Sequence, residues 1–192
     1  MLCVYCTKRI GVEIIGNRLR REIITLEQEQ FNSFFKYTEA VCKHIVSENK
    51  LMQPFVFFGY IDDGELSIEY YPLLMATEED KGLSIVFING YTKKTNPDIV
   101  SLGAVVYVAE FDNITTEEME TIELEGIRNA YRRKQAIFVT SKSKEYVRTE
   151  YIIFGDTGSK IVFAEPQIAD GPENEISNKF LKGIFVGGES SE

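Results

Sequence analysis

One stretch of the chain specifies its structure more tightly than any other, because two β-forming runs flank a D-D-G turn signal at residues 62–64. The run F-V-F-F-G-Y covers residues 55–60, and E-L-S-I-E-Y-Y covers residues 65–71. Asp-Gly between two such runs favours a tight turn, since both residue types tolerate positive φ. Pro54 holds the residue before it in an extended conformation. The sequence therefore predicts a β-hairpin here.

Two segments predict helices. Residues 26–49 carry Phe and other apolar side chains at helical spacing, and Thr25 with Gln28 three positions later has the spacing of a capping box. Residues 77–95 are ambiguous, because their Thr-x-x-Asp start is typical of a helix whereas L-S-I-V-F-I alone is compatible with a strand. The length of this segment and the Asn-Pro that follows it favour a helix.

Most of the remaining periodic segments predict strands. The run A-V-V-Y-V-A-E-F is nearly all apolar, which is typical of a strand covered on both faces. A second hairpin, a further strand and a short C-terminal helix follow it. This order predicts an α+β fold, with a single antiparallel or mixed sheet of about six strands and helices packed mainly on one side. The segments are 104–111, 135–141, 145–154, 160–165 and, for the helix, 174–185.

The chain is expected to have three parts, and the charge distribution marks the first of them. Residues 1–26 contain five Lys or Arg against two Asp or Glu, a net charge of +3 in a chain whose total is −9. We expect this basic arm either to form a hairpin that turns at Gly16-Asn17 or to be loosely held. Residues 27–188 are expected to form a single α+β domain, and residues 189–192 a frayed tail.

A metal site is the first chemistry to consider. Cys3, Cys6, Cys42 and His44 are the only Cys and His residues of the chain, and zinc accepts such a Cys₃His set. Successive helical residues turn by ~100°, so Cys42 and His44 would lie about 200° apart on one helix. We therefore expect a buried Cys42 and an exposed His44. We expect neither a bound metal nor any other cofactor.

Other catalytic signatures are absent from the sequence. It contains no G-x-x-x-x-G-K-[ST] or G-x-G-x-x-G phosphate-binding loop and no G-x-S-x-G nucleophile elbow. Nucleophilic catalysis assisted by histidine would have to use His44. Two alternatives stay open. One is a hydrolase that depends on carboxylates or a metal and assembles its site from distant residues, and the other is a small-ligand sensor domain with a pocket among the aromatic residues.

One cluster of charges is unusual enough to be a candidate binding site. Glu110 ends an apolar strand, and a carboxylate in that place must be solvated or paired. Arg128, Arg132 and Arg133 lie shortly before the next strand of an otherwise acidic chain. A structural ion pair between neighbouring strand ends accounts for this pattern. The functional interpretation is a recognition site for an anionic group.

A resemblance covers roughly residues 50–186. It rests on P-F-V-F-F-G-Y, D-D-G-E-L, V-V-Y-V-A-E-F and R-R-K-Q-A-I-F-V-T in this order, with a late G-x-F that ends at Phe185. This layout resembles small uncharacterised bacterial and phage proteins of unknown function. In those proteins an aromatic residue, often Trp, follows the Ala-Glu pair, and Phe111 takes that place here. The resemblance implies a two-layer α+β domain with no recognised catalytic set.

These features together predict a cytoplasmic, non-catalytic protein that binds another protein, such as an accessory factor of a phage or mobile element. The net charge of −9 repels phosphate backbones, so nucleic acid is not an expected partner. No apolar run approaches the ~20 residues that span a bilayer, so no membrane partner is expected. Three cysteines do not make a disulfide framework, which fits reduced thiols.

Overall fold

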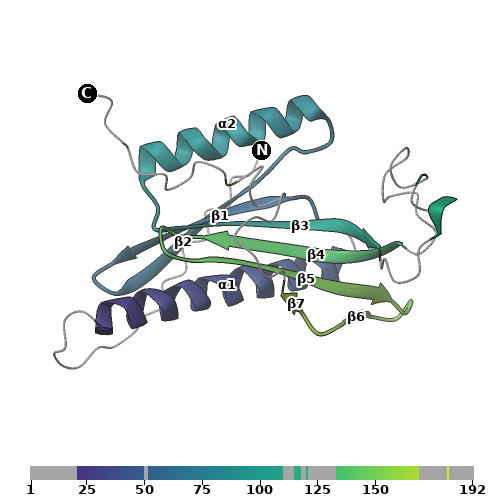
Figure 1. The fold of residues 1–192 in the computed structure, drawn as a ribbon, viewed down its shortest axis with the longest axis horizontal. Coiled ribbons are helices and arrows are strands. Elements are labelled where there is room, and N and C mark those ends of the chain that lie inside the picture. The colour runs from purple at the N-terminus through teal and green to yellow at the C-terminus, as the bar shows by residue number, and fades with distance from the viewer. Residues whose placement is uncertain are drawn as a thin grey trace.

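The computed structural model describes residues 21–49, 52–109, 115–117, 120, 133–168 and 181 of the chain. Two helices and seven strands follow one another in these ranges (Figure 1). They are α1 (Arg21–Asn49), β1 (Phe55–Asp62), β2 (Glu65–Pro72), α2 (Glu78–Thr95), β3 (Ile99–Ala109), β4 (Arg133–Lys142), β5 (Val147–Asp156), β6 (Ile161–Phe163) and β7 (Gln167–Ile168).

All seven strands belong to one sheet. Its order is β2-β1-β3-β4-β5-β6, and β7 pairs with β5 beyond the end of β6. Every pairing is antiparallel. The predicted α+β class and the single sheet of about six strands are therefore confirmed. The two-residue β7 lies between the strand predicted at residues 160–165 and the helix predicted at residues 174–185, where the sequence indicated no element.

The first hairpin forms where the D-D-G signal predicts it. Asp62 pairs with Glu65, which leaves Asp63 and Gly64 as the two turn residues. Their φ angles are 47° and 82°. Positive φ at both positions matches the right-handed twist of the flanking strands, and Asp and Gly adopt it at low cost.

The ambiguous segment is a helix, because its ends are capped on both sides. The Thr77 side chain accepts from the Asp80 backbone N–H at 3.1 Å, and the Asp80 carboxylate accepts from the Thr77 N–H at 3.0 Å. This reciprocal pair satisfies two donors that a helix start leaves open. Asn96 ends α2 with a left-handed φ of 48°, and Pro97 follows it.

The two helices cover opposite faces of the sheet (Figure 1). This arrangement differs from the expectation that helices would pack mainly on one side. Phe57 packs in the cluster beneath α1, whereas Val56 and Phe58 pack in the cluster beneath α2, and all three are fully buried. Consecutive strand residues point to opposite faces, so a strand that is apolar at every position needs a cover on each side.

Two glycines let α1 lie close to the sheet. A Cβ placed on Gly59 would lie 2.8 Å from ring atoms of Phe34, and one placed on Gly103 would lie 2.5 Å from the Cys42 sulfur. Either distance is shorter than real contacts allow. The Phe34 ring and the Cys42 thiol therefore occupy space that only glycine leaves open on β1 and β3.

The start of α1 corrects one expectation. The helix begins at Arg21, so Thr25 lies inside it and is not its N-cap. No Pro or Gly interrupts residues 21–26, and the helix therefore continues back past the capping signal. Residues 1–20 of the predicted arm and the tail at 189–192 lie outside the described residues. Of the predicted C-terminal helix, only Leu181 is described, and it is helical and buried.

An ion pair with a buried carboxylate and a partly exposed guanidinium ties β5 to α1. Glu150 is 2% exposed, and its Oε1 accepts from the Arg148 Nε at 2.9 Å. The same guanidinium donates to the Asn32 side chain at 3.3 Å and lies 4.7 Å from the ring centroid of Phe35. The guanidinium therefore neutralises a buried carboxylate and also contacts two side chains of α1.

Removing this guanidinium should destabilise the protein strongly. We expect Arg148→Met, which retains much of the apolar stem, to lower the free energy of unfolding by about 3–5 kcal/mol, since Glu150 is left charged and buried. Urea denaturation at neutral pH measures this value. Lys160→Met removes an exposed cation and should change it by less than about 0.5 kcal/mol. The double variant Arg148→Met/Glu150→Gln should recover part of the lost stability, because its buried side chain is neutral. If Arg148→Met loses no more stability than Lys160→Met, the prediction is contradicted.

A tyrosine network joins α2 to the hairpin. Tyr91 on α2 donates its hydroxyl to Glu69 Oε2 at 2.6 Å, and the Tyr71 and Tyr91 hydroxyl oxygens lie 2.8 Å apart. Tyr60 donates to Thr95 Oγ1 at 3.0 Å. Burial, together with the hydrogen bond to Glu69, raises the pKa of Tyr91 above its ordinary value, and burial also raises the pKa of Tyr60. Both phenols therefore stay neutral at physiological pH and act as donors.

The raised pKa of Tyr91 predicts a loss of stability in alkali. In the unfolded chain the phenol ionises near pH 10, whereas the folded state keeps its proton, so stability is complete below about pH 10 and falls above it. We expect Tyr91→Phe to lose about 1–2 kcal/mol at pH 7 and to show a shallower decline between about pH 10 and 11. Urea denaturation across this range measures both effects. Parallel alkaline declines in the two proteins would contradict the assignment.

Candidate functional site

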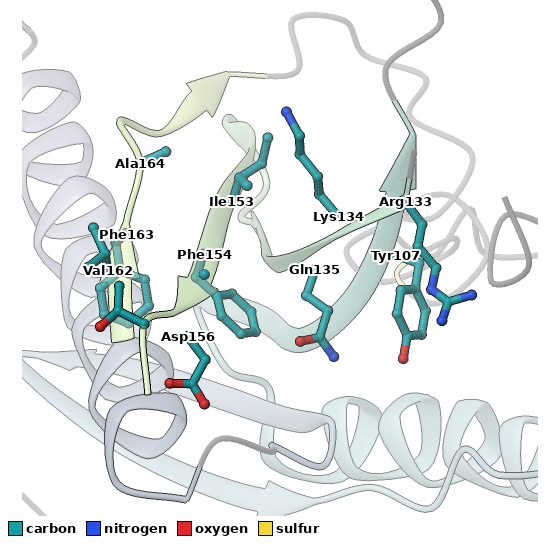
Figure 2. A pocket seen from close by; sticks show the side chains of 12 residues that line it. Tyr107, Arg133, Lys134, Gln135, Ile153, Phe154, Asp156, Val162, Phe163 and Ala164 are labelled. Carbon is teal, nitrogen blue, oxygen red and sulfur yellow. The ribbon is translucent and has the colours of Figure 1, made fainter. Parts of the chain in front are cut away.

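An open groove lies over the ends of four neighbouring strands (Figure 2). Its volume is about 780 Å³. Its lining combines aromatic rings, two cations, a carboxylate and an amide, contributed by β3, β4, β5, β6 and the turn between β5 and β6. The residues are Tyr107, Arg133, Lys134, Gln135, Ile153, Phe154, Gly155, Asp156, Thr157, Val162, Phe163 and Ala164.

The pairing register places four of these side chains in one row. Tyr107 is opposite Gln135, Gln135 is opposite Phe154, and Phe154 is opposite Phe163. Directly paired residues of antiparallel strands point to the same face, so this row crosses β3, β4, β5 and β6 on the α1 side. The Phe154 and Phe163 rings lie 6.2 Å apart at 55°. Figure 2 shows Tyr107, Gln135 and Phe154 pointing the same way, whereas Lys134 points the opposite way.

The groove carries opposite charges at its two ends. The Arg133 guanidinium lies 5.6 Å from the ring centroid of Tyr107 on β3. At the β5 end, the Asp156 carboxylate accepts from the Gly158 backbone N–H at 2.7 Å. The Phe154 ring and the Gln135 side chain lie between these ends, whereas Phe163 lies on the far side of Asp156 (Figure 2). The groove therefore has a guanidinium at its β3 end and a carboxylate at its β5 end, with the largely buried Phe154 ring between them.

The cover over the sheet thins along this row, because Phe154 is still buried in the core beneath α1 whereas Tyr107 at the β3 end is exposed. The preceding row consists of Val105, Ile137 and Ile152, and it belongs to the core beneath α1, where both isoleucines are fully buried. Two residues further along β3, Tyr107 is 36% exposed. The Tyr107 ring, near the end of β3, therefore has surface with which another molecule can make contact.

Of the four residues predicted to recognise an anion, the structure describes Arg133. It is exposed at the start of β4 and lines the groove. Its Cα partner across the sheet is Ala109, so the ends of β3 and β4 lie side by side. Glu110, Arg128 and Arg132 lie outside the described residues, and the proposed pair between Glu110 and an arginine stays a prediction.

The two helical members of the possible metal set point apart, as the 200° estimate predicted. Cys42 is fully buried in the core beneath α1, whereas His44 is exposed. Cys3 and Cys6 lie outside the described residues. Within the part of the chain that the structure describes, no three His, Cys, Asp or Glu side chains converge closely enough to hold a metal ion.

The burial of Cys42 predicts a thiol that does not react in the native protein. Burial, with a smaller contribution from the Glu39 carboxylate, raises the pKa of the Cys42 thiol to about 12. In a Cys3→Ser/Cys6→Ser variant, Ellman's reagent at pH 8 should detect no thiol until guanidinium unfolds the protein, and then one equivalent. Native labelling within minutes would show that Cys42 is accessible and would contradict its placement.

Comparisons with protein-family models, with curated proteins and with solved structures give no significant match. Among the described helices, none combines the length and apolar character that crossing a membrane requires. Inference of function therefore rests on the residues of this chain.

Sequence reasoning missed most of the groove. Tyr107 belongs to an apolar strand run, Asp156 to a turn signal, and Phe154 and Phe163 to predicted strands. Nothing in the sequence aligns these residues, because the alignment depends on the register between four strands. The one signal that pointed here is the cluster of basic residues before β4.

Proposed function

We propose that this protein is a non-catalytic binding domain that holds an extended segment of a partner protein in the groove over β3 to β6. The observation that carries the proposal is the row from Tyr107 to Phe163, flanked by the Arg133 guanidinium. Aromatic and Arg side chains supply most of the binding energy in protein interfaces, because they bury large areas with few flexible bonds.

The shape of the groove favours a peptide over a small ligand. Small molecules bury most of their surface in enclosed pockets, whereas here Tyr107 is 36% exposed and Asp156 is exposed as well. A segment with an acidic residue near Arg133, apolar residues over the Tyr107 ring and a basic residue near Asp156 is complementary to the lining. A small-ligand sensor is the second candidate, since a volume of about 780 Å³ would also admit a metabolite.

The remaining parts of the proposal come from the sequence. A cytoplasmic location, a role as an accessory factor and an origin in a phage or mobile element stay predictions. A hydrolase would have to use Asp156, which is the carboxylate of the groove, or carboxylates elsewhere in the chain. The Asp156 carboxylate accepts a hydrogen bond from the Gly158 backbone N–H of its own turn. Hydrogen bonding of this kind positions Asp156 to present its charge at the end of the groove.

Selection of binding peptides tests the proposal directly. Peptides of random sequence would be selected on the wild-type protein, and their dissociation constants measured by fluorescence anisotropy. We expect Tyr107→Ala and Arg133→Glu each to weaken the selected peptides by about 10- to 100-fold. Both positions are exposed, so the fold should tolerate the changes.

Two matched variants serve as controls. Val147→Ala removes an exposed strand side chain at the opposite end of β5, and Lys36→Glu reverses an exposed charge on α1. Neither should change peptide affinity by more than about twofold. Equal weakening by the controls, or peptides that bind the groove variants as tightly as the wild type, would contradict the proposal. Competition by a metabolite that raises Tm would favour the sensor instead.

A further inference from the structure

Helix α2 is apolar on both of its sides. Ser84 and Ile88 face the sheet and are buried. On the outward side Leu83 is 61% exposed and Val86 68%, and beside them Phe87, whose ring also packs against Tyr71 and Tyr91, is 38% exposed. These three residues follow the i, i+3, i+4 spacing of a single helical stripe. Figure 1 shows α2 as the outermost layer above the sheet, so the stripe lies on the surface of the chain.

The same outward side contains a glycine that none of the described residues requires. Gly90 lies seven residues after Leu83, on the same stripe, and a Cβ placed on it would meet no atom within 4 Å. Glycine inside a helix is costly, because the unfolded chain loses more freedom there than at alanine. A glycine on an exposed apolar stripe is accounted for when the surface of a second helix packs against it.

Charges of opposite sign lie at the two ends of the stripe. The first turn of α2 carries Glu78, Glu79 and Asp80, and its last turn carries Lys93 and Lys94. Glu78 pairs with Lys81. Glu79, Lys93 and Lys94 form no ion pair within the part of the chain that the structure describes.

We propose that the outward face of α2 is a homodimer interface, in which two copies of the chain pack their α2 helices antiparallel about a twofold axis between Val86 and Phe87. In such a self-complementary pairing, each contact occurs twice. Val86 of each copy lies opposite Phe87 of the other, and Leu83 lies opposite Gly90.

The charges select this orientation and a second copy as the occupant. The antiparallel register that sets Leu83 against Gly90 also sets Glu79 opposite Lys94. A parallel pairing would instead bring Glu79 against Glu79 and Lys94 against Lys94, which repel. The face therefore complements itself in size and in charge, which an unrelated partner would match only by having the same pattern.

The size of the face sets the expected strength. An α-helix of 18 residues is about 27 Å long, and one helix pair buries less area than a standard interface. The dimer is therefore expected to be reversible, with a dissociation constant in the micromolar range. This interface lies on the face of the sheet opposite the groove row, so dimer formation and peptide binding are independent.

Sedimentation of the full chain tests the interface. We expect wild type to shift from monomer to dimer as its concentration rises from about 1 to about 200 µM, and Val86→Glu to weaken association at least about 10-fold. Ala40→Glu, which adds the same charge at an exposed position of α1, should leave association unchanged. Circular dichroism confirms that both variants are folded. A wild type that stays monomeric, or a dimer that Val86→Glu leaves intact, would overturn the proposal.

Charge reversal tests the register separately. Glu79→Lys and Lys94→Glu should each weaken the dimer, and the double variant should restore it, because the swapped charges meet again across the twofold axis. If the double variant instead weakens the dimer by the product of the two single fold-changes, the antiparallel pairing is overturned.

Gly90→Ala separates packing between copies from stability within one copy. It should raise Tm by about 2–4 °C in the Val86→Glu background, where α2 gains helix propensity. In the otherwise wild-type chain it should weaken the dimer, because the added methyl group fills the space that Leu83 of the other copy occupies. An unchanged or tighter dimer would overturn the proposal.

Discussion

The close contact between α1 and two sheet glycines determines how the rest of this structure is arranged. Phe34 lies over Gly59, and eight residues later Cys42 lies over Gly103. Eight residues span about 12 Å along a helix. Gly103 pairs with Phe55, which is four positions from Gly59 along β1, or about 13 Å. The two spacings match, so α1 runs nearly along the strands and both contacts form at once.

This placement of α1 decides which part of the sheet is core and which part is groove. Beneath the helix, Ile137 and Ile152 are fully buried. One row further the cover is partial: Phe154 is still buried and Lys43 of α1 lies over the Phe163 ring, whereas Tyr107 on β3 is exposed and lines the open hollow. The groove therefore lies where the ends of β3, β4 and β5 extend past the C-terminal end of α1 (Figure 1). A candidate binding surface of this kind needs no special loop.

The sequence predicted those elements that are specified by neighbouring residues. The D-D-G turn, the cap of α2 formed by Thr77 and Asp80, and the opposite directions of Cys42 and His44 all depend on residues a few positions apart. The start of α1 was misplaced, because a capping pair can lie inside a helix when helix-compatible residues precede it. The cover on both faces was implied by the apolar strand at residues 104–111, although the predicted helices were placed mainly on one side.

The candidate sites were harder to predict, because they depend on distant parts of the chain. Arg133 was identified from charge alone, whereas its aromatic neighbour Tyr107 is recognisable only once β3 and β4 are in register. The outward stripe of α2 was hidden for a different reason. Its apolar residues are interleaved with the buried ones, and a helix with two apolar sides lacks the simple periodicity that marks one buried face.

The two short strands β6 and β7 have a consequence for how molecules of this protein behave at high concentration. An uninterrupted outer strand can add strands from other molecules and so begin aggregation. Here β5 pairs on its outer side with three residues of β6 and then two of β7, and Pro166 lies between them. Proline has no N–H to offer an incoming chain. An added strand would find only a broken hydrogen-bonding ladder, so sheet-to-sheet polymerisation from this side is blocked.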